Sequence, residues 1–281
     1  MNAESRVLVD VPWLQAHGED PSVRIVEVDV DVYSYDEGHI PGAVGWNWST
    51  QLCDTDRRDI LSRGDLEALL GAAGITPKTT VILYGDNNNW FAAWALWQLK
   101  IYGHEDVRLL DGGRRKWIQM GGELTNDVPA HARTEYTARD ADLSLRAFLD
   151  DVRRDSAART VGLVDVRSLA EFTGEILAPP GLPETCQRGG HIPGASSIPW
   201  GKVCSEDGTF LPREELEALY AAAGIGRDKP VVTYCRIGER SSHSWFVLKY
   251  LLEYDDVRNY DGSWTEWGNM VGVPIEKGEP E

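Results

Sequence analysis

Cysteine is scarce in this sequence, which has four in 281 residues. They stand at positions 53, 186, 204 and 235, far apart in the chain and without a CxxC pair. A disulfide framework needs several cysteines in a short secreted chain, and a structural zinc site needs closely paired ones. The pattern therefore argues against both, and we expect reduced thiols.

Targeting signals and excess positive charge are also lacking. The N-terminal stretch has neither the basic start nor the apolar core of a secretory signal. No run approaches the roughly eighteen apolar residues of a membrane span. The formal net charge is −17, whereas general nucleic-acid binding needs a basic face. We therefore expect a cytoplasmic protein that binds neither membranes nor nucleic acids.

An internal repeat is the strongest feature that the sequence does contain. The stretch GHIPGA at 38–43 returns at 190–195, and DLEALLGAAGI at 65–75 returns as ELEALYAAAGI at 215–225. The offset of the second pair also aligns EDVRLLDGG with DDVRNYDGS nearer the end of each copy. Self-similarity of this kind indicates a duplicated structural unit.

The repeat predicts two homologous domains, at residues 1–122 and 146–281. The segment between them, 123–145, is polar and shows little periodicity, which is typical of a linker. Since one duplicated chain can supply its own domain–domain contact, the duplication is compatible with a monomer.

Both copies predict the same succession of strands and helices. Short apolar or β-branched strands alternate with helices, as in a parallel sheet that is covered on both faces. The fold class is therefore α/β, with two domains that each contain a parallel β-sheet flanked by helices on both faces. Ligands of such domains bind beyond the carboxyl ends of the strands. The predicted strands lie at 23–30, 80–85 and 107–113 in the first copy and at 160–167, 230–235 and 257–263 in the second.

Cys235 ends one of these strands, and the repeat aligns it with Gly85 in the first copy. The loop that follows contains Gly238, which lets backbone amides turn inward, and two arginines, Arg236 and Arg240. Cationic groups and a helix N-terminus lower the pKa of a thiol and so make it a nucleophile. An inert buried cysteine is the alternative. The charged loop and the difference between the copies favour a catalytic second domain and an inactive first one.

The doubled GHIPGA, the CRIGER loop at 235–240 and DGSWTEWG at 261–268 resemble the tandem-domain rhodaneses, the thiosulfate and mercaptopyruvate sulfurtransferases. The resemblance extends from about Leu8 to Ile275. It implies that Cys235 takes the sulfane sulfur of a small-molecule donor as a persulfide. The sulfur then passes to a thiophilic acceptor such as cyanide or a thiol, with no metal or organic cofactor.

The same resemblance indicates which residues bind the substrate. The loop amides are expected to surround the outer sulfur of the persulfide. Two further arginines lie in the longer segment before the second His-Ile-Pro-Gly turn, where a surface salt bridge is the alternative role. The expected set is Arg236, Ile237, Gly238, Glu239, Arg240, Ser241, Arg167 and Arg188.

Thiosulfate is the expected donor, because a dianion suits a loop with two arginines. The loop resembles the thiosulfate type through Arg236, but Ile237 stands where vertebrate members have lysine, and Glu239 adds a negative charge. Arg240 is expected to replace that lysine as the anchor of the donor. A second substrate arginine of the family falls near Glu171 here. A mercaptopyruvate donor, which goes with a loop of small polar residues, is the alternative.

Two other classes of function fit the pattern less well. The loop of a cysteine phosphatase or arsenate reductase would have one more residue than the four that separate Cys235 from Arg240. The shorter loop makes a narrower cradle, suited to one sulfur atom. A non-catalytic sulfur-binding module would use Cys235 only as a docking site, and turnover with a defined donor would distinguish an enzyme from it.

Several other conspicuous residues are expected to be structural. His39 and His191 occur in both copies, including the one without a cysteine, which favours a role in the turn. His243 is expected to be packed or partly exposed rather than catalytic, and Trp264 is a candidate wall of the pocket. The three remaining cysteines are expected to be inert.

Overall fold

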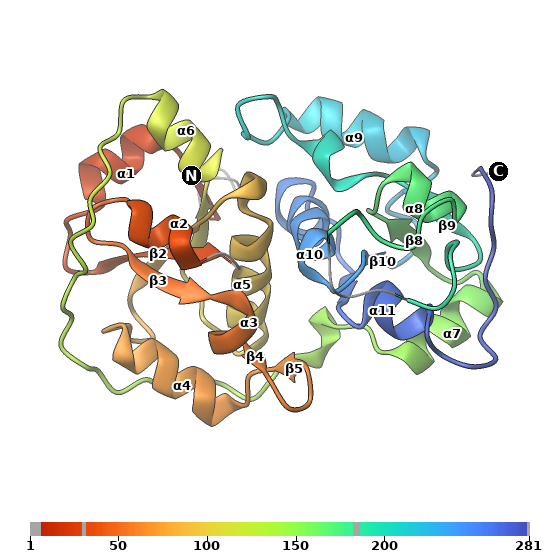
Figure 1. Ribbon diagram of the computed structural model, residues 1–281, viewed down its shortest axis with the longest axis horizontal. Coiled ribbons are helices and arrows are strands. Elements are labelled where there is room, and N and C mark those ends of the chain that lie inside the picture. The colour runs from red at the N-terminus through yellow and green to blue at the C-terminus, as the bar shows by residue number, and fades with distance from the viewer. Residues whose placement is uncertain (1–6, 30–31, 182–185, 280–281) are drawn as a thin grey trace. The chain divides into compact units, whose positions relative to one another are not determined.

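The chain forms two compact units in a computed structural model that describes residues 7–29, 32–181 and 186–279. Each unit contains a parallel sheet flanked by helices, which confirms the predicted α/β class (Figure 1). The first unit comprises Met1–Asp142 with Cys204–Phe210, and the second comprises Leu143–Val203 with Leu211–Glu281.

The sheet of the first unit has the strand order β1-β7-β6-β2-β3, and every neighbouring pair is parallel. Its strands are β1 (Leu8–Val9), β2 (Val23–Asp29), β3 (Val44–Asn47), β6 (Thr80–Tyr84) and β7 (Val107–Leu110), and an antiparallel hairpin is formed by β4 (Cys53–Asp54) and β5 (Asp59–Ile60). Its helices are α1 (Val11–His17), α2 (Val32–Glu37), α3 (Trp48–Gln51), α4 (Arg63–Ala72), the 3-10 turn η2 (Asn87–Asn89), α5 (Trp90–Ile101) and α6 (Gly113–Gln119).

The sheet of the second unit has the strand order β11-β10-β8-β9, again with parallel pairs. Its strands are β8 (Gly162–Asp165), β9 (Ala195–Ser197), β10 (Val231–Tyr234) and β11 (Val257–Tyr260). Its helices are η3 (Leu143–Leu145), α7 (Leu149–Ala158), α8 (Leu169–Thr173), η4 (Trp200–Val203), α9 (Arg213–Ala222), α10 (Glu239–Phe246), the π-helical turn η5 (Val247–Leu251) and α11 (Ser263–Trp267).

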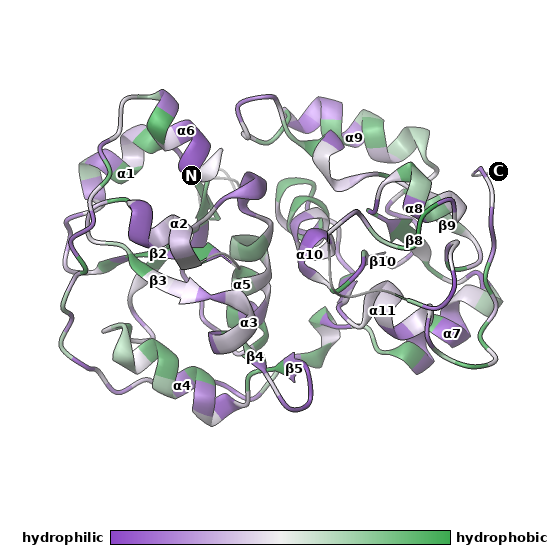
Figure 2. Ribbon diagram, in the orientation of Figure 1, coloured by the Kyte–Doolittle hydropathy of each residue, from purple (hydrophilic) through white to green (hydrophobic). Residues whose placement is uncertain are grey.

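The elements with the clearest patterns form where the sequence predicts them. Strand β10 is buried at every residue, as a strand covered on both faces must be. Helix α5 is apolar around its whole circumference and almost entirely buried. Helices α4 and α9 instead carry hydrophilic and hydrophobic residues side by side, as helices with one face toward a core do (Figure 2).

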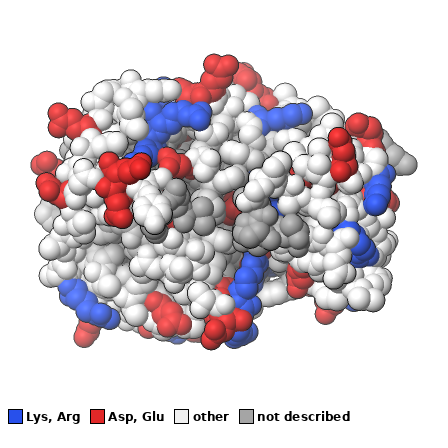
Figure 3. Space-filling model, viewed as in Figure 1, with Lys and Arg blue, Asp and Glu red and all other residues white. Residues whose placement is uncertain are grey.

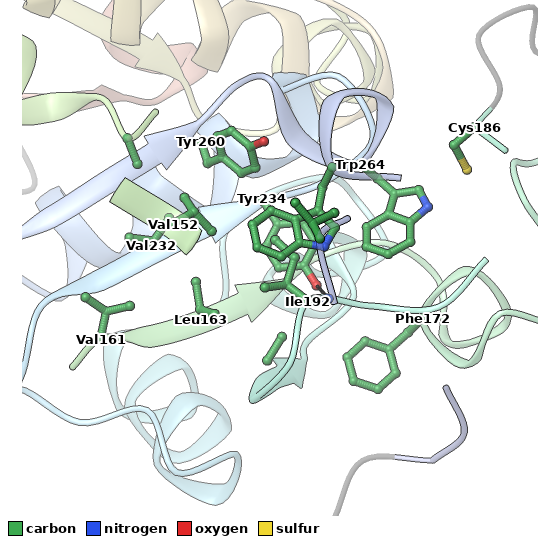
Figure 4. Packing of buried hydrophobic residues seen from close by; sticks show 14 residues of the cluster. Val152, Val161, Leu163, Phe172, Cys186, Ile192, Val232, Tyr234, Tyr260 and Trp264 are labelled. Atoms are coloured by element: carbon green, nitrogen blue, oxygen red, sulfur yellow. Dashed lines mark hydrogen bonds between the residues drawn. The ribbon is translucent and has the colours of Figure 1, made fainter. Parts of the chain in front are cut away.

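The His-Ile-Pro-Gly turn is fixed to the central strand in the same way in both units. The amide of Ile192 donates to the hydroxyl of Tyr234 at 3.1 Å, within the buried cluster drawn in Figure 4. In the first unit the amide of Ile40 donates to the hydroxyl of Tyr84 at 2.9 Å. Since Tyr84 and Tyr234 end β6 and β10, the turn braces the strand end from which the candidate site begins.

The two turn histidines are structural, as predicted. The ring of His39 stacks on Tyr35 with 3.8 Å between centroids, and that of His191 stacks on Phe172 with 3.6 Å. A ring nitrogen of each histidine also lies within hydrogen-bond distance of a backbone carbonyl, that of Tyr35 or Phe172. Both rings therefore pack within the turn and hydrogen-bond to its surroundings.

The predicted linker, 123–145, is for most of its length part of the first unit. His39 and Thr125 form an antiparallel bridge, and the amide of Asp142 donates to the carbonyl of Ile101 at 2.8 Å. The segment follows the surface of the unit without entering a regular helix or strand before Leu143. The segment is irregular, as its lack of hydrophobic periodicity predicts, but its backbone is hydrogen-bonded to the first unit.

The seven residues Cys204–Phe210 also group with the first unit, although they lie in the second repeat. Asp207 forms an ion pair with Lys116 at 2.5 Å, and the amide of Phe210 donates to Asp111 at 2.9 Å. Hydrogen bonds between residues so far apart in the chain do not affect the hydrophobic periodicity of the sequence. The domain boundaries predicted from the sequence therefore place residues 204–210 in the second domain.

The end of β6 in the first unit has no room for a cysteine side chain. A Cβ on Gly85 would lie 2.4 Å from the carbonyl oxygen of Val28 and 3.0 Å from a carboxylate oxygen of Asp29. Burial, together with the neighbouring Glu27, raises the pKa of Asp29 to about 8. The next turn, Asn87–Asn89, has left-handed backbone at all three residues, with φ of 51°, 54° and 66°. The first copy therefore lacks both the thiol and the loop that follows it.

Replacing Gly85 with cysteine is expected to lower the free energy of unfolding by about 1–3 kcal/mol, because the side chain would overpack against the Val28 carbonyl. Urea unfolding of the full chain measures this. Gly64→Ala is the control, since a Cβ there meets only the Ser62 hydroxyl at 4.0 Å. A Gly85→Cys protein as stable as the wild type would show that the first unit can hold a thiol at this point.

Candidate active site

Cys235 directly follows β10 and is tied by its backbone to the start of α11. Its amide donates to the hydroxyl of Ser263 at 3.0 Å, and its carbonyl accepts from the amide of Trp264 at 3.1 Å. The side chain is fully buried, with 0% of its surface exposed. The strand end, rather than a flexible loop, therefore fixes the position of the sulfur.

The loop after Cys235 turns back on the sulfur at Gly238. This residue has φ of +101°, and a Cβ would lie 2.6 Å from the Cβ of Asp261, so a side chain is excluded for two reasons. The amide of Gly238 donates to the Cys235 sulfur at 3.1 Å. Hydrogen bonds from Ser241 also favour the anionic form of the sulfur. The predicted cradle of amides is therefore present on at least this side of the sulfur.

The rest of the loop is held by its own backbone and by β11. The carbonyl of Gly238 accepts from Asn259 at 3.2 Å and from the hydroxyl of Ser241 at 3.0 Å. The carbonyl of Arg236 accepts from the amide of Thr265 at 3.0 Å. The side chains of Arg236, Ile237 and Ser241 are buried, so the loop is packed on all sides.

The surroundings of Cys235 include groups that oppose its thiolate as well as groups that favour it. Burial raises the pKa of the thiol above its ordinary value, and the negative charge of Glu239 raises it further. Arg240 and Ser241 act in the opposite direction without reversing the shift. The thiol donates to a carboxylate oxygen of Glu239 at 3.3 Å. The cationic groups and amides near Cys235 can be predicted from the sequence, whereas the cost of removing the thiol from water depends on the fold.

Arg240, the predicted anchor of the donor, lies between two carboxylates. Its guanidinium donates to both oxygens of Glu171, at 3.2 and 3.3 Å, and its Nε lies 3.6 Å from Glu239. Burial would raise the pKa of Glu171, but Arg240 and the hydrogen bonds from Ser168 hold it below its ordinary value. Glu171 thus balances the charge of Arg240. It lies near the position where the family resemblance implies a second arginine.

Arg167 is buried under the second His-Ile-Pro-Gly turn and not at the surface. Its guanidinium donates to Asp165 at 2.6 Å and to the carbonyl of Gly190 at 2.7 Å. It also lies over the ring of Trp264, 4.4 Å from the centroid. These contacts account for a structural role without any substrate.

The first unit has the same arrangement with an arginine from elsewhere in the sequence. Arg114 donates to Glu27 and to the carbonyl of Gly38, the counterpart of Gly190. Glu27 pairs with Tyr84 across the sheet just as Asp165 pairs with Tyr234. Because a copy without the cysteine keeps this cluster, its function is to support the turn.

Arg188 binds the C-terminal segment of the second unit. Its guanidinium donates to the carbonyls of Trp267, Gly268, Met270 and Val273. Its own carbonyl accepts from the indole of Trp264 at 3.0 Å. A contact between Arg188 and a substrate would require these bonds to break.

The remaining conspicuous residues agree with a structural reading. His243 is fully buried in α10. Cys186 is buried with its sulfur 3.2 Å from the carbonyl of Arg188. Burial, with help from Asp111 and Asp207, raises the pKa of Cys204 to about 12, which disfavours its thiolate.

The sequence reading missed Ser263, Asn259 and Asp261, which hold Cys235 and Gly238 in place. All three lie in or directly after β11, beside the loop. The doubled Asp-Gly motif that follows this strand was the available signal, because it recurs at the same distance in the first copy.

The two halves of the chain, residues 10–120 and 148–270, each match the family model of the rhodanese-like domain. The chain belongs to the rhodanese-like family. This agrees with two α/β units of common topology and with a cysteine at the end of the central strand in the second.

Relatives of the same length carry sulfurtransferase or sulfur-carrier names. A protein of Haloferax volcanii named "Putative thiosulfate sulfurtransferase" is 53% identical over 277 residues, covering 97% of this chain and 96% of the relative. The "Sulfur carrier protein TtuD" of Thermus thermophilus is 53% identical over 281 residues, covering 99% of each chain. Together with the family match, these names place the chain among the sulfurtransferases.

Solved structures of an ergothioneine enzyme share the fold of the whole chain. The anaerobic ergothioneine biosynthesis enzyme of Chlorobium limicola, in complex with trimethyl histidine, is 27% identical with a TM-score of 0.86. The match covers 99% of this chain and 71% of that one. A persulfide form of EanB with ergothioneine is 26% identical with a TM-score of 0.87, over 100% of this chain and 72% of that one.

The described residues carry no feature of a nucleic-acid-binding surface on the drawn face, of a metal site or of a membrane span. On the face drawn in Figure 3, acidic and basic side chains are interspersed and do not form one large basic patch. Within residues 7–29, 32–181 and 186–279, no group of three or more acidic, cysteine or histidine side chains could hold a metal ion. None of the helices in these described ranges is long and apolar enough to cross a membrane.

Arg167→Ala is expected to lower the free energy of unfolding by about 3–5 kcal/mol, because it leaves the buried Asp165 without its partner. Urea unfolding measures the loss. Arg153→Ala, which removes an exposed arginine 3.7 Å from Asp150, is the control and should cost less than about 1 kcal/mol. Unchanged stability with a raised KM for the sulfur donor would instead make Arg167 a substrate contact.

The rate of Cys235 alkylation by iodoacetamide is expected to keep rising with pH beyond the point where the unfolded chain levels off. The reason is the raised pKa of the buried thiol, against about 8.5 for a free one. Mass spectrometry of the Cys235 peptide, with the urea-unfolded chain as control, gives both profiles. A plateau reached at a lower pH than in the unfolded chain would show instead that the folded site lowers the pKa of Cys235.

Proposed function

We propose that this chain transfers the sulfane sulfur of thiosulfate to a thiophilic acceptor through a persulfide on Cys235. The observation that carries the proposal is the position of the Cys235 sulfur. It lies at the end of β10 and accepts a hydrogen bond from the amide of Gly238, whereas the first copy has Gly85 at the corresponding position. The sulfurtransferase names of full-length relatives support the same chemistry.

The reaction is a double displacement. The thiolate of Cys235 attacks the outer sulfur of thiosulfate, a new S–S bond forms, and sulfite leaves with the electron pair of the broken S–S bond. The outer sulfur of the persulfide carries the negative charge. The amide of Gly238, the hydrogen bonds of Ser241 and the charge of Arg240 are the groups placed to stabilise it. An acceptor then attacks the outer sulfur and releases the Cys235 thiolate.

Access and charge constrain the donor. Cys235 has no exposed surface, so a donor reaches it only when the atoms around the sulfur move. Arg240 is paired with Glu171 and lies near Glu239, so the loop offers a dianion less net positive charge than its two arginines suggest. A donor with a single negative charge, such as the carboxylate of 3-mercaptopyruvate, needs less positive charge and is therefore tested beside thiosulfate. The name of the Thermus relative adds a second candidate, in which this chain acts as a sulfur carrier.

Incubation with thiosulfate is expected to add the mass of one sulfur atom to the intact chain, and cyanide should remove it. The same incubation with 3-mercaptopyruvate is run in parallel. Cys235→Ser should take up no sulfur, whereas Cys186→Ser, which removes another buried thiol, should load as the wild type does. Loading by 3-mercaptopyruvate alone would replace the donor in this proposal, and loading by neither would refute it.

A further inference from the structure

Glu239 lies in an unusual place for an acid. It is the first residue of α10 and 2% exposed, and its Oε2 lies 3.3 Å from the Cys235 sulfur. A buried carboxylate beside a nucleophilic thiol opposes the formation of a thiolate by charge repulsion. The same group lies 3.6 Å from Arg240, so it faces both the thiol and the cation of the site.

We propose that Glu239 is the proton acceptor that activates Cys235, and that it accepts the proton of a thiol acceptor in the second half-reaction. The inference rests on the proposed function. Its geometric basis is the hydrogen bond from the Cys235 thiol to Glu239, since a general base must lie within reach of the proton that it removes. Because Glu239 contacts the reacting atom, it is a catalytic residue.

Charge balance supports this role. Transfer of the proton from Cys235 to Glu239 turns a thiol and a carboxylate into a thiolate and a carboxylic acid, so the net charge of the buried site does not change. Ionisation of the thiol to bulk water would instead add a second buried negative charge beside the first, which is costly in a site of low polarity.

The neighbouring groups favour the charge after it has moved to sulfur. The amide of Gly238 donates to the sulfur. Arg240 and Ser241 lower the pKa of Cys235, and Arg240 is held in place by Glu171. The charged groups around the pair come from the loop, from α8, from the turn after β11 and from the segment before α7. They are Arg236, Arg240, Glu171, Asp261 and Arg146, of which the last two form an ion pair.

The first half-reaction then balances without a proton from solvent. The S–H bond of Cys235 breaks, its electron pair stays on sulfur and the proton moves to Glu239. The thiolate attacks thiosulfate, and the proton on Glu239 passes to the departing sulfite. The thiol and thiosulfate thus give the persulfide anion and hydrogen sulfite.

The second half-reaction depends on the acceptor. A thiol must lose its proton before it attacks the outer sulfur, and Glu239 is the group placed to take it. The proton returns to Cys235 when the product persulfide leaves. Cyanide attacks as an anion and gives thiocyanate, so discharge by cyanide needs no base at this site.

The test is Glu239→Gln, which keeps the shape of the side chain and removes its basicity. Rapid-quench mass spectrometry measures loading by thiosulfate and discharge of the loaded protein by cyanide and by dithiothreitol. At pH 7 we expect loading and thiol discharge to slow by about 100-fold, the lower end of the usual effect of a general base. Cyanide discharge should stay at the wild-type rate. Loading of the variant should approach that of the wild type above the pKa of the thiol.

Two further variants serve as controls. Glu239→Asp keeps a carboxylate and should recover part of the loading rate, and Glu214→Gln removes an exposed first-turn glutamate from α9 and should have no effect. Normal cyanide discharge by Glu239→Gln, after loading at high pH, shows that its site is folded.

The opposite outcome is equally specific. If Glu239 acts only by its charge, Glu239→Gln lowers the pKa of Cys235 and speeds loading at pH 7, which overturns the inference. A wild-type protein that thiosulfate never loads refutes the proposed function instead. In that case the pH profile of Cys235 alkylation still tests Glu239, since the variant must lose reactivity at neutral pH if the glutamate is the base.

Discussion

The hydrogen bond from the Gly238 amide to the Cys235 sulfur is the contact on which the site depends. It exists because Gly238 adopts a left-handed backbone and approaches Asp261 more closely than any side chain would permit. Asn259 and Ser241 hold the carbonyl on the other side of the same residue. The strand end, the turn and α10 therefore enclose a single sulfur atom.

The two units show which parts of this architecture serve the fold and which serve the chemistry. The tyrosine that ends the central strand, the bond to the His-Ile-Pro-Gly turn and a buried arginine–carboxylate pair occur in both. The thiol, the glycine at the turn and the charged helix start occur only in the second. In the first unit the backbone of Val28 occupies the space that a thiol would need. The two copies therefore share the sheet and its brace, whereas the thiol and its loop are present in the second copy alone.

The sequence was a good guide to features that depend on local pattern. The central strands, the amphipathic helices and the position of Cys235 at a strand end follow from hydrophobic runs and from the repeat. The strands β1, β4, β5 and β9 have only two or three residues each and carry no period that could reveal them. The pair of Arg240 and Glu171 joins residues 69 positions apart, so only the folded chain brings it together. The pKa of Cys235 depends on burial, which no list of neighbours along the chain can supply.

Arg188 connects two parts of the second unit that have no sequence relation. The guanidinium of Arg188 donates to four carbonyls in residues 267–273. The backbone carbonyl of Arg188 accepts a hydrogen bond from the indole of Trp264, and the amide of Trp264 donates to the carbonyl of Cys235. Residues 267–273 are therefore bound to the segment before the turn and, through Trp264, to the backbone at Cys235. Loss of the hydrogen bonds between Arg188 and residues 267–273 would therefore weaken the backbone contacts of Cys235, at a distance from the groups that contact its sulfur.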